Sequence, residues 1–184
     1  MLIAGIDFSL NGPSVCLFDN TKEFNWSNVD VYYISKTQKY IINNDTLHGD
    51  LLQEQPDNFH RWEYLKAWCY DKIQDCDFVL IEGYSYSSKG SSIFQIAEAS
   101  GITKQNIWTH NIQIETVPPK TIKKYYTDNG NAGKPLMYQF FKVKTGVNLI
   151  KMLDYKKAKI DSPIGDIVDS FSILSYAIDH YHFV

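Results

Sequence analysis

Hydrophobic residues along this chain fall into two patterns, short unbroken apolar runs and longer segments in which apolar positions recur every three or four residues. The first pattern is typical of a buried strand, and the second predicts a helix that packs by one face. The short runs predict strands at residues 2–8, 14–18, 29–35, 78–81 and 112–117. The helical spacing predicts helices at residues 59–73, 92–107, 134–146 and 167–182.

Three further segments lack these strong patterns and are interpreted from their local composition. The dipeptide Pro118-Pro119 ends the last strand, and a short lysine-bearing helix is expected directly after it. Residues 43–57 are polar and predict a loop, to which no function can be given. Residues 151–163 show neither pattern clearly, so their structure is left open.

The order of these elements indicates the fold class. Three strands come first, with a turn at Asn11-Gly12-Pro13, and resemble an antiparallel meander. Strands and helices then alternate, which points to a mixed α/β sheet covered by helices. The 184 residues fit one domain, spanning 1–184.

Composition agrees with a globular protein, at 44% hydrophobic and 21% charged residues. No apolar run approaches the roughly 20 residues of a membrane span, so no membrane partner is expected. Three cysteines without metal-ligand spacing, and a first strand in place of a basic leader, predict a reduced protein of the cytoplasm.

The net charge of −3 hides an asymmetry. Residues 120–160 contain ten lysines and two acids, a local charge of +8, so the rest of the chain carries −11. Such a segment is either a phosphate-binding surface or a solvated helical face, and charge alone does not decide between them.

Four acids stand where strands end or a helix begins. Asp7 lies near the end of the first strand, Glu82 follows the strand at 78–81, and Asp166 and Asp169 share one face at the start of the last helix. Taken singly, each fits a turn, a helix cap or a surface position. As a set they predict a metal site, because Mg²⁺ takes a few carboxylates plus water and substrate phosphate.

The stretch VPPKTIKKYYTDNGNAGKP, residues 117–135, is the most distinctive in the chain. It predicts a strand end, a short basic helix and a polar turn that leads to Lys134. Lysines placed there could bind phosphates or stabilise a charged transition state.

In this order the motifs resemble those of the RuvC family of Holliday-junction resolvases, especially its phage members. The matching segments are Gly5-Ile6-Asp7, Val79-Leu80-Ile81-Glu82, Ile122-Lys123 with the segment 127–134, and Asp166-Ile167-Val168-Asp169. Three positions depart from the family's pattern. The segment after Asp7 reads Phe8-Ser9-Leu10-Asn11 in place of Pro-Gly. Asp128 replaces the first glycine of a Gly-x-Gly, and Ser85 stands where the family often has an aromatic residue, here flanked by Tyr84 and Tyr86.

The resemblance implies an RNase H-like α/β fold, a mixed five-stranded sheet flanked by helices. It implies that Asp7, Glu82, Asp166 and Asp169 bind two Mg²⁺ or Mn²⁺ ions, with Lys134 also in the catalytic centre. It further implies a homodimer that resolves a four-way junction by paired nicks, leaving 5′-phosphate and 3′-hydroxyl ends. The residues expected to contact DNA are Tyr84, Tyr86, Lys89, Lys120, Lys123, Lys124 and Lys134.

Other functions are weighed against this one. A related nuclease would act more broadly on branched DNA or on an RNA–DNA hybrid, and a non-catalytic module would bind nucleic acid without cutting it. For the tyrosines, stacking on bases and an ordinary loop position are equally open. An actin-like or sugar-kinase ATPase would need a second phosphate loop and a chain about twice as long. A viral origin, suggested by the phage-like motif, would place the protein in the host cytoplasm.

Overall fold

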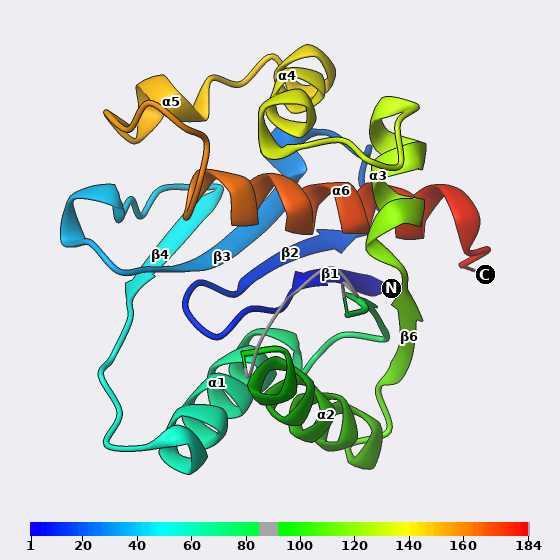
Figure 1. Cartoon of the computed structure of the whole chain (residues 1–184). Helices are drawn as coiled ribbons and strands as arrows, with labels where there is room; N and C mark the ends of the chain where they lie inside the picture. Colours follow the sequence, from blue (N-terminus) through cyan, green and yellow to red (C-terminus); the bar gives the residue numbers. More distant parts are fainter. Residues whose placement is uncertain (85–91, 184) are drawn as a thin grey trace.

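A six-stranded mixed sheet with helices on both faces forms the protein, as seen in a computed structural model that describes residues 1–84 and 92–183 (Figure 1). The strands are β1 Leu2–Asp7, β2 Ser14–Asp19, β3 Val29–Ser35, β4 Leu47–Leu51, β5 Phe78–Glu82 and β6 Gln113–Val117. The α-helices are α1 Asn58–Ile73, α2 Ser92–Thr109, α3 Pro119–Thr127, α4 Lys134–Thr145, α5 Leu149–Met152 and α6 Ile164–His180, and two 3-10 turns are η1 Trp26–Asn28 and η2 Gln38–Tyr40.

The strand order is β4-β3-β2-β1-β5-β6. The first three strands are antiparallel neighbours, which confirms the predicted meander. β5 then runs parallel to β1, and β6 parallel to β5. The mixed α/β class flanked by helices is therefore confirmed.

The predicted number of five strands is wrong, because β4 lies within residues 43–57 that the polar sequence assigns to a loop. β4 pairs in parallel with β3 at the edge of the sheet. Only Leu47 and Gly49 of this strand are buried, while the other three side chains keep contact with solvent. An edge strand with one inward leucine has no apolar run, so periodicity misses it.

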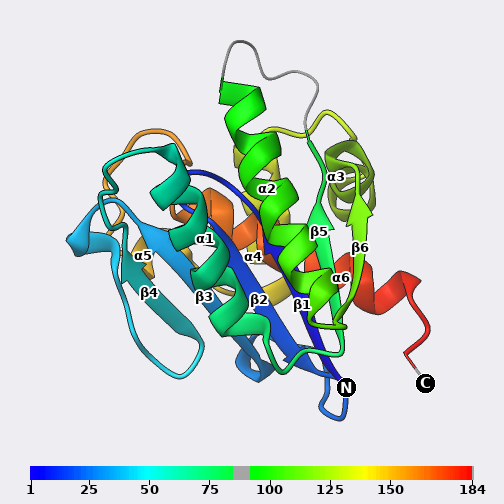
Figure 2. The ribbon, with the colours of Figure 1, turned by 90° about the horizontal axis from the view of Figure 1, so that it is seen from below.

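Helices α1 and α2 cover one face of the sheet, and α6 with α3 and α4 covers the other (Figures 1 and 2). Alternation along each strand divides its side chains between the two faces. In β1, Ile3 faces the α6 side and Ile6 the α1 side. Asp7 is four residues from Ile3, so it belongs to the α6 side. By the same alternation, Glu82 in β5 shares the α6 side with Phe78.

Helix α6 lies directly against β1 because β1 carries a glycine at the crossing. A Cβ atom on Gly5 would lie 2.4 Å from the Leu174 backbone nitrogen and 2.7 Å from the Ser170 carbonyl oxygen. No side chain fits in that space, so Gly5 sets the distance between helix and strand. The same packing brings the first turns of α6 beside the end of β1.

Among the described helices, none combines the length and apolarity that crossing a bilayer requires.

Candidate active site

The predicted acids gather where two neighbouring parallel strands end beneath α6. Ile6 and Ile81 are register partners, so Asp7 and Glu82, the next residues, end β1 and β5 side by side. Asp166 and Asp169 sit one turn apart in the first half of α6, on the same face of the sheet. The charges of Asp169, Glu82 and Asp166 all act on Asp7. The structure therefore brings the four predicted carboxylates into one cluster.

Burial and crowding hold these carboxyl groups closer to neutral than usual. Burial raises the pKa of Asp7 well above its ordinary value, and the three neighbouring acids raise it further. Burial, with the charge of Asp169, raises the pKa of Glu82 to about 7. Burial also raises the pKa of Asp169 to about 7, although Lys134 partly offsets it. Four acids enclosed in this way favour a bound cation.

Lys134 supplies positive charge at this cluster. As the first residue of α4, it places its ammonium 3.3 Å from Asp166 Oδ1. Burial lowers the pKa of Lys134, but the charges of Asp166, Asp169 and Asp7 outweigh burial and raise it above the usual value. Gly165 leaves the room for this side chain, since a Cβ atom there would lie 2.6 Å from Lys134 Nζ.

Whether the residues fit a metal ion can be judged from Asp166. Its Oδ1 contacts Lys134, whereas its Oδ2 is buried and has no partner in hydrogen-bonding geometry among the residues that the structure describes. An unpartnered buried carboxylate oxygen is costly, and a cation would satisfy it. The cluster offers only carboxylate oxygens, the donors that hard divalent cations prefer. Asp7, Glu82 and Asp169 are half-buried, so water and phosphate can reach them.

The carboxylates do not form a ready-made metal cage. Within residues 1–84 and 92–183, no three Asp, Glu, His or Cys side chains are placed to hold one metal ion together. Mg²⁺ does not require one, because it commonly keeps several waters and binds substrate phosphate through one or two carboxylates. The residues therefore fit an open divalent-cation site that substrate would complete.

The predicted lysines of α3 lie at different distances from the cluster. Lys123 is close enough to lower the pKa values of Glu82 and Asp169 against the effect of burial. Lys120 and Lys124 are exposed on the same helix, and Lys124 Nζ lies 3.6 Å from Asp128 Oδ1. The structure thus brings Lys123 and Lys134 to the carboxylates and leaves the other two at the surface.

Asp128 resolves one departure from the resolvase pattern. It ends α3 in the left-handed conformation, with φ of 58°. Glycine adopts this conformation most easily, and Asp is among the few other residues that tolerate it. The turn after α3 therefore takes a left-handed residue at this position, which Asp128 provides and which glycine would also fit.

The predicted aromatic contacts are only partly described. Tyr84, 38% exposed, donates a hydrogen bond from its hydroxyl to the Ala97 carbonyl oxygen at 3.3 Å. Lys104 Nζ lies 4.7 Å from the centre of its ring. The ring is thus fixed against α2, close to Glu82 in the chain. Tyr86, Lys89 and Ser85 lie outside the described residues.

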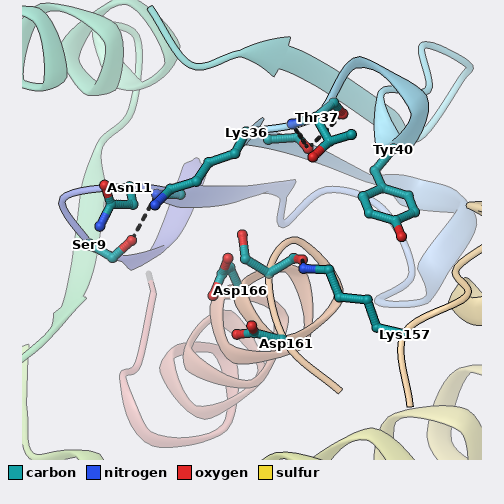
Figure 3. Close-up of a pocket in the computed structure, with 11 residues that line it drawn as sticks. Ser9, Asn11, Lys36, Thr37, Tyr40, Lys157, Asp161 and Asp166 are labelled. Atoms are coloured by element: carbon teal, nitrogen blue, oxygen red, sulfur yellow. Dashed lines mark hydrogen bonds between the residues drawn. The ribbon is translucent and has the colours of Figure 1, made fainter. Parts of the chain in front are cut away.

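Sequence reasoning missed a cavity of about 300 Å³ beside Asp166. It lies between the β1–β2 turn, the end of β3 and the segment before α6, and Lys36 and Lys157 line it with Asp161 and Asp166 (Figure 3). Lys157 belongs to the basic segment 120–160, which was a signal, whereas nothing in the sequence marks Lys36.

No protein-family model matches the chain. The crossover junction endodeoxyribonuclease RuvC of Brachyspira hyodysenteriae is 32% identical over 71 residues. This match covers 39% of the chain and 44% of RuvC, so it spans less than half of that relative's length.

Solved structures are similar over nearly the whole chain. Thermus thermophilus RuvC has a TM-score of 0.62 at 14% identity, with 97% of this chain and 96% of RuvC covered. The T. thermophilus RuvC structure in complex with Holliday junction substrate gives the same values. At this identity the likeness establishes the fold, and the predicted RNase H-like architecture is confirmed, with six strands in place of five.

Proposed function

We propose that the chain is a RuvC-like endonuclease that resolves four-way junctions and other branched DNA by paired, metal-dependent hydrolysis of phosphodiester bonds. The observation that carries the proposal is the convergence of Asp7, Glu82, Asp166 and Asp169 with Lys134 on the RuvC fold. The partial sequence match to RuvC supports the same activity.

In this proposal the four carboxylates hold two Mg²⁺ or Mn²⁺ ions. When bound, such ions supply Lewis-acid stabilisation of the phosphodiester and lower the pKa of a nucleophilic water. Asp7 and Glu82 are fixed by the rigid strand ends, which keeps their oxygens in place without loop motion. Lys134, already 3.3 Å from Asp166, would balance negative charge that develops on the phosphate.

DNA would reach the carboxylates along α3. Lys123 lies next to Glu82 and Asp169, and Lys120 and Lys124 extend the basic surface away from them. These lysines suit a phosphate backbone, since electrostatic contacts position DNA without reading its sequence. We propose that Tyr84, Tyr86 and Lys89, which follow Glu82 in the chain, contribute further contacts to the DNA.

A homodimer is proposed from one face of α2. Phe94 and Trp108 lie on this face and are 70% and 69% exposed, and the neighbouring Ile102 is 38% exposed. Gly101 lies between them with open space where a Cβ would point. An exposed glycine inside a helix costs about 0.5–1 kcal/mol relative to alanine, so it needs a reason. Close approach of α2 from a second copy provides one and would pair two active sites.

A substrate panel tests the activity. Purified protein with Mg²⁺ is incubated with a four-way junction, a Y-fork, linear duplex DNA and an RNA–DNA hybrid. The proposal expects paired nicks in the junction, slower cutting of the fork, and little cutting of the duplex or hybrid. Equal rates on hybrid and junction would favour the broader nuclease, and binding without cutting would favour the non-catalytic module.

A further inference from the structure

The cavity beside Asp166 lies outside every role assigned so far. We propose that Lys36 and Lys157 together bind a backbone phosphate of the cleaved strand, one or two nucleotides from the bond that is cut. This inference rests on the proposed function, because it assigns a neighbouring subsite to the same nuclease centre. It names two residues that neither the motifs nor the α3 lysines include.

The position of the cavity ties it to the carboxylates. Asp166 lines the cavity and also belongs to the acidic cluster. Gly12, in the turn after β1, leaves space beside Asp166. A Cβ atom there would lie 3.0 Å from Asp166 Oδ2 and 2.8 Å from Ser162 Oγ. A group held in the cavity is therefore an immediate neighbour of the proposed metal site.

The two lysines are available for an external anion. Across residues 1–84 and 92–183, neither Lys36 nor Lys157 has a carboxylate within 4.0 Å of its ammonium. Asp166 is paired with Lys134 instead. Asp161 also lines the cavity, so the lysines exceed the unpaired acids by one positive charge. A phosphodiester group, with one negative charge, would balance that excess.

Lys157 is already positioned for this task. Its Nζ lies 3.4 Å from the Ser162 carbonyl oxygen. It also lies 5.8 Å and 5.6 Å from the ring centres of Tyr40 and Tyr155. These contacts restrict the long side chain before a ligand arrives, which lowers the entropy lost on binding. Figure 3 shows Lys36 ending beside Ser9 and Asn11 and Lys157 ending beside Asp166, so the two side chains border the cavity from different parts of the chain.

The remaining walls suit a nucleotide rather than an apolar ligand. Ser9, Asn11 and Thr37 line the cavity and offer hydroxyl and amide groups. Its volume of about 300 Å³ is at the small end of ligand sites and suits a single nucleotide. Asn11 and Lys36 also border a second hollow lined by Gln53, Glu54, Gln55 and Arg61. The segment after β4 would thus extend the surface that contacts the DNA strand.

The position of Lys36 also explains how a DNA strand could be held on both sides of the cut. In the sheet order, β3 lies on one side of β1 and β5, and β6, which leads into α3, lies on the other. Lys36 follows β3, whereas Lys123 belongs to α3. A DNA strand that crosses the carboxylates would therefore meet Lys36 on one side of the scissile phosphate and Lys123 on the other.

A methylphosphonate scan tests this subsite. Single backbone linkages of a junction are made neutral in turn around the cut, and binding is measured in the Asp7→Asn background, which leaves the DNA intact. With both lysines present, one linkage within about two nucleotides of the cut should weaken binding by roughly tenfold when neutralised. The double variant Lys36→Gln/Lys157→Gln should bind the native junction about tenfold more weakly. Neutralising that same linkage should then weaken its binding no further.

Two neighbouring lysines provide matched controls. Lys39 is exposed beside Lys36 in the chain, and Lys156 is paired with Asp154 at 3.0 Å. Lys39→Gln/Lys156→Gln removes the same charge and should leave the linkage effect intact. The subsite would be overturned if both double variants lost the same affinity for the junction. It would also be overturned if the neutral linkage still weakened binding by the variant that lacks Lys36 and Lys157. Absence of DNA binding would overturn it too, whereas a protein that binds with this coupling but cuts no junction would contradict only the proposed function.

Discussion

At the scale of single residues, the site depends on acids held in an environment that disfavours their charge. Glu82 and Asp169 have pKa values raised to about 7, chiefly by burial, and Asp7 is raised well above its usual range by burial and three acidic neighbours. Enclosing acids in this way costs stability when no cation is present, and a cation recovers that stability.

This cost predicts how stability changes with pH. Because these acids hold protons more tightly in the folded state than in the unfolded state, folding binds protons between about pH 4 and 7. In EDTA, the melting temperature should therefore fall as the pH rises through this range. Asp169→Asn removes one of these acids, so it should stabilise the metal-free protein by at least about 1 kcal/mol at about pH 8.

Addition of Mg²⁺ completes that test. At about pH 8 it should raise the melting temperature of the wild type and have much less effect on Asp169→Asn. A melting temperature that does not change with pH or with Mg²⁺ would show that the four acids are not a crowded cation site.

Gly165 is predicted to act through Lys134. Alanine at this position would displace the Lys134 side chain, whose Nζ would otherwise lie 2.6 Å from the new Cβ. Lysine can move away, and alanine favours a helix, so stability should be nearly unchanged. Single-turnover cleavage should fall by roughly tenfold to a hundredfold, as when one transition-state contact is lost.

A double variant shows whether Gly165 acts by that route. Gly165→Ala combined with Lys134→Met should be no slower than Lys134→Met alone, because both changes remove the same contact. If the rate reductions of the two single variants instead multiply in the double variant, Gly165 affects the reaction in another way.

At the scale of elements, the crossing of α6 over β1 assembles the site. Gly5 permits backbone contact between the two, with Leu174 and Ser170 at its Cβ position. Gly5→Ala should lower the free energy of unfolding by about 3 kcal/mol, the upper end of the usual cost of overpacking, since neither backbone can yield easily. Chemical denaturation measures this loss, with Gly133→Ala as a control, because a Cβ atom there would make only an ordinary contact, 3.7 Å from Pro135 Cδ. Equal stabilities for the two variants would contradict the packing argument.

The exposed face of α2 predicts the assembly state. Trp108→Glu should produce a monomer in analytical ultracentrifugation and convert paired cuts into single nicks, because each copy would then act alone. Phe59→Glu is a matched control, since Phe59 is 74% exposed on α1. An unchanged mass for Trp108→Glu would refute the α2 interface.

At the scale of the whole molecule, the sequence predicts most of the layered architecture. Apolar runs and helical spacing identify five strands and the longer helices because the buried faces carry a strong pattern. The edge strand β4 is missed since only Leu47 and Gly49 are buried. The acids could be found because they end strands or begin a helix. Lys36 could not, because its place beside Asp166 depends on the path of β3 and the segment before α6.

The central claim is that the four carboxylates form a nuclease centre. The most direct measurement compares cleavage of a four-way junction by the wild type, Glu82→Gln and Glu115→Gln with Mg²⁺. Glu115 is an exposed acid on the neighbouring strand β6, so its variant controls for the loss of charge. We predict paired nicks by the wild type and Glu115→Gln and a loss of at least about a hundredfold in Glu82→Gln. Cleavage by Glu82→Gln at the wild-type rate would contradict the claim.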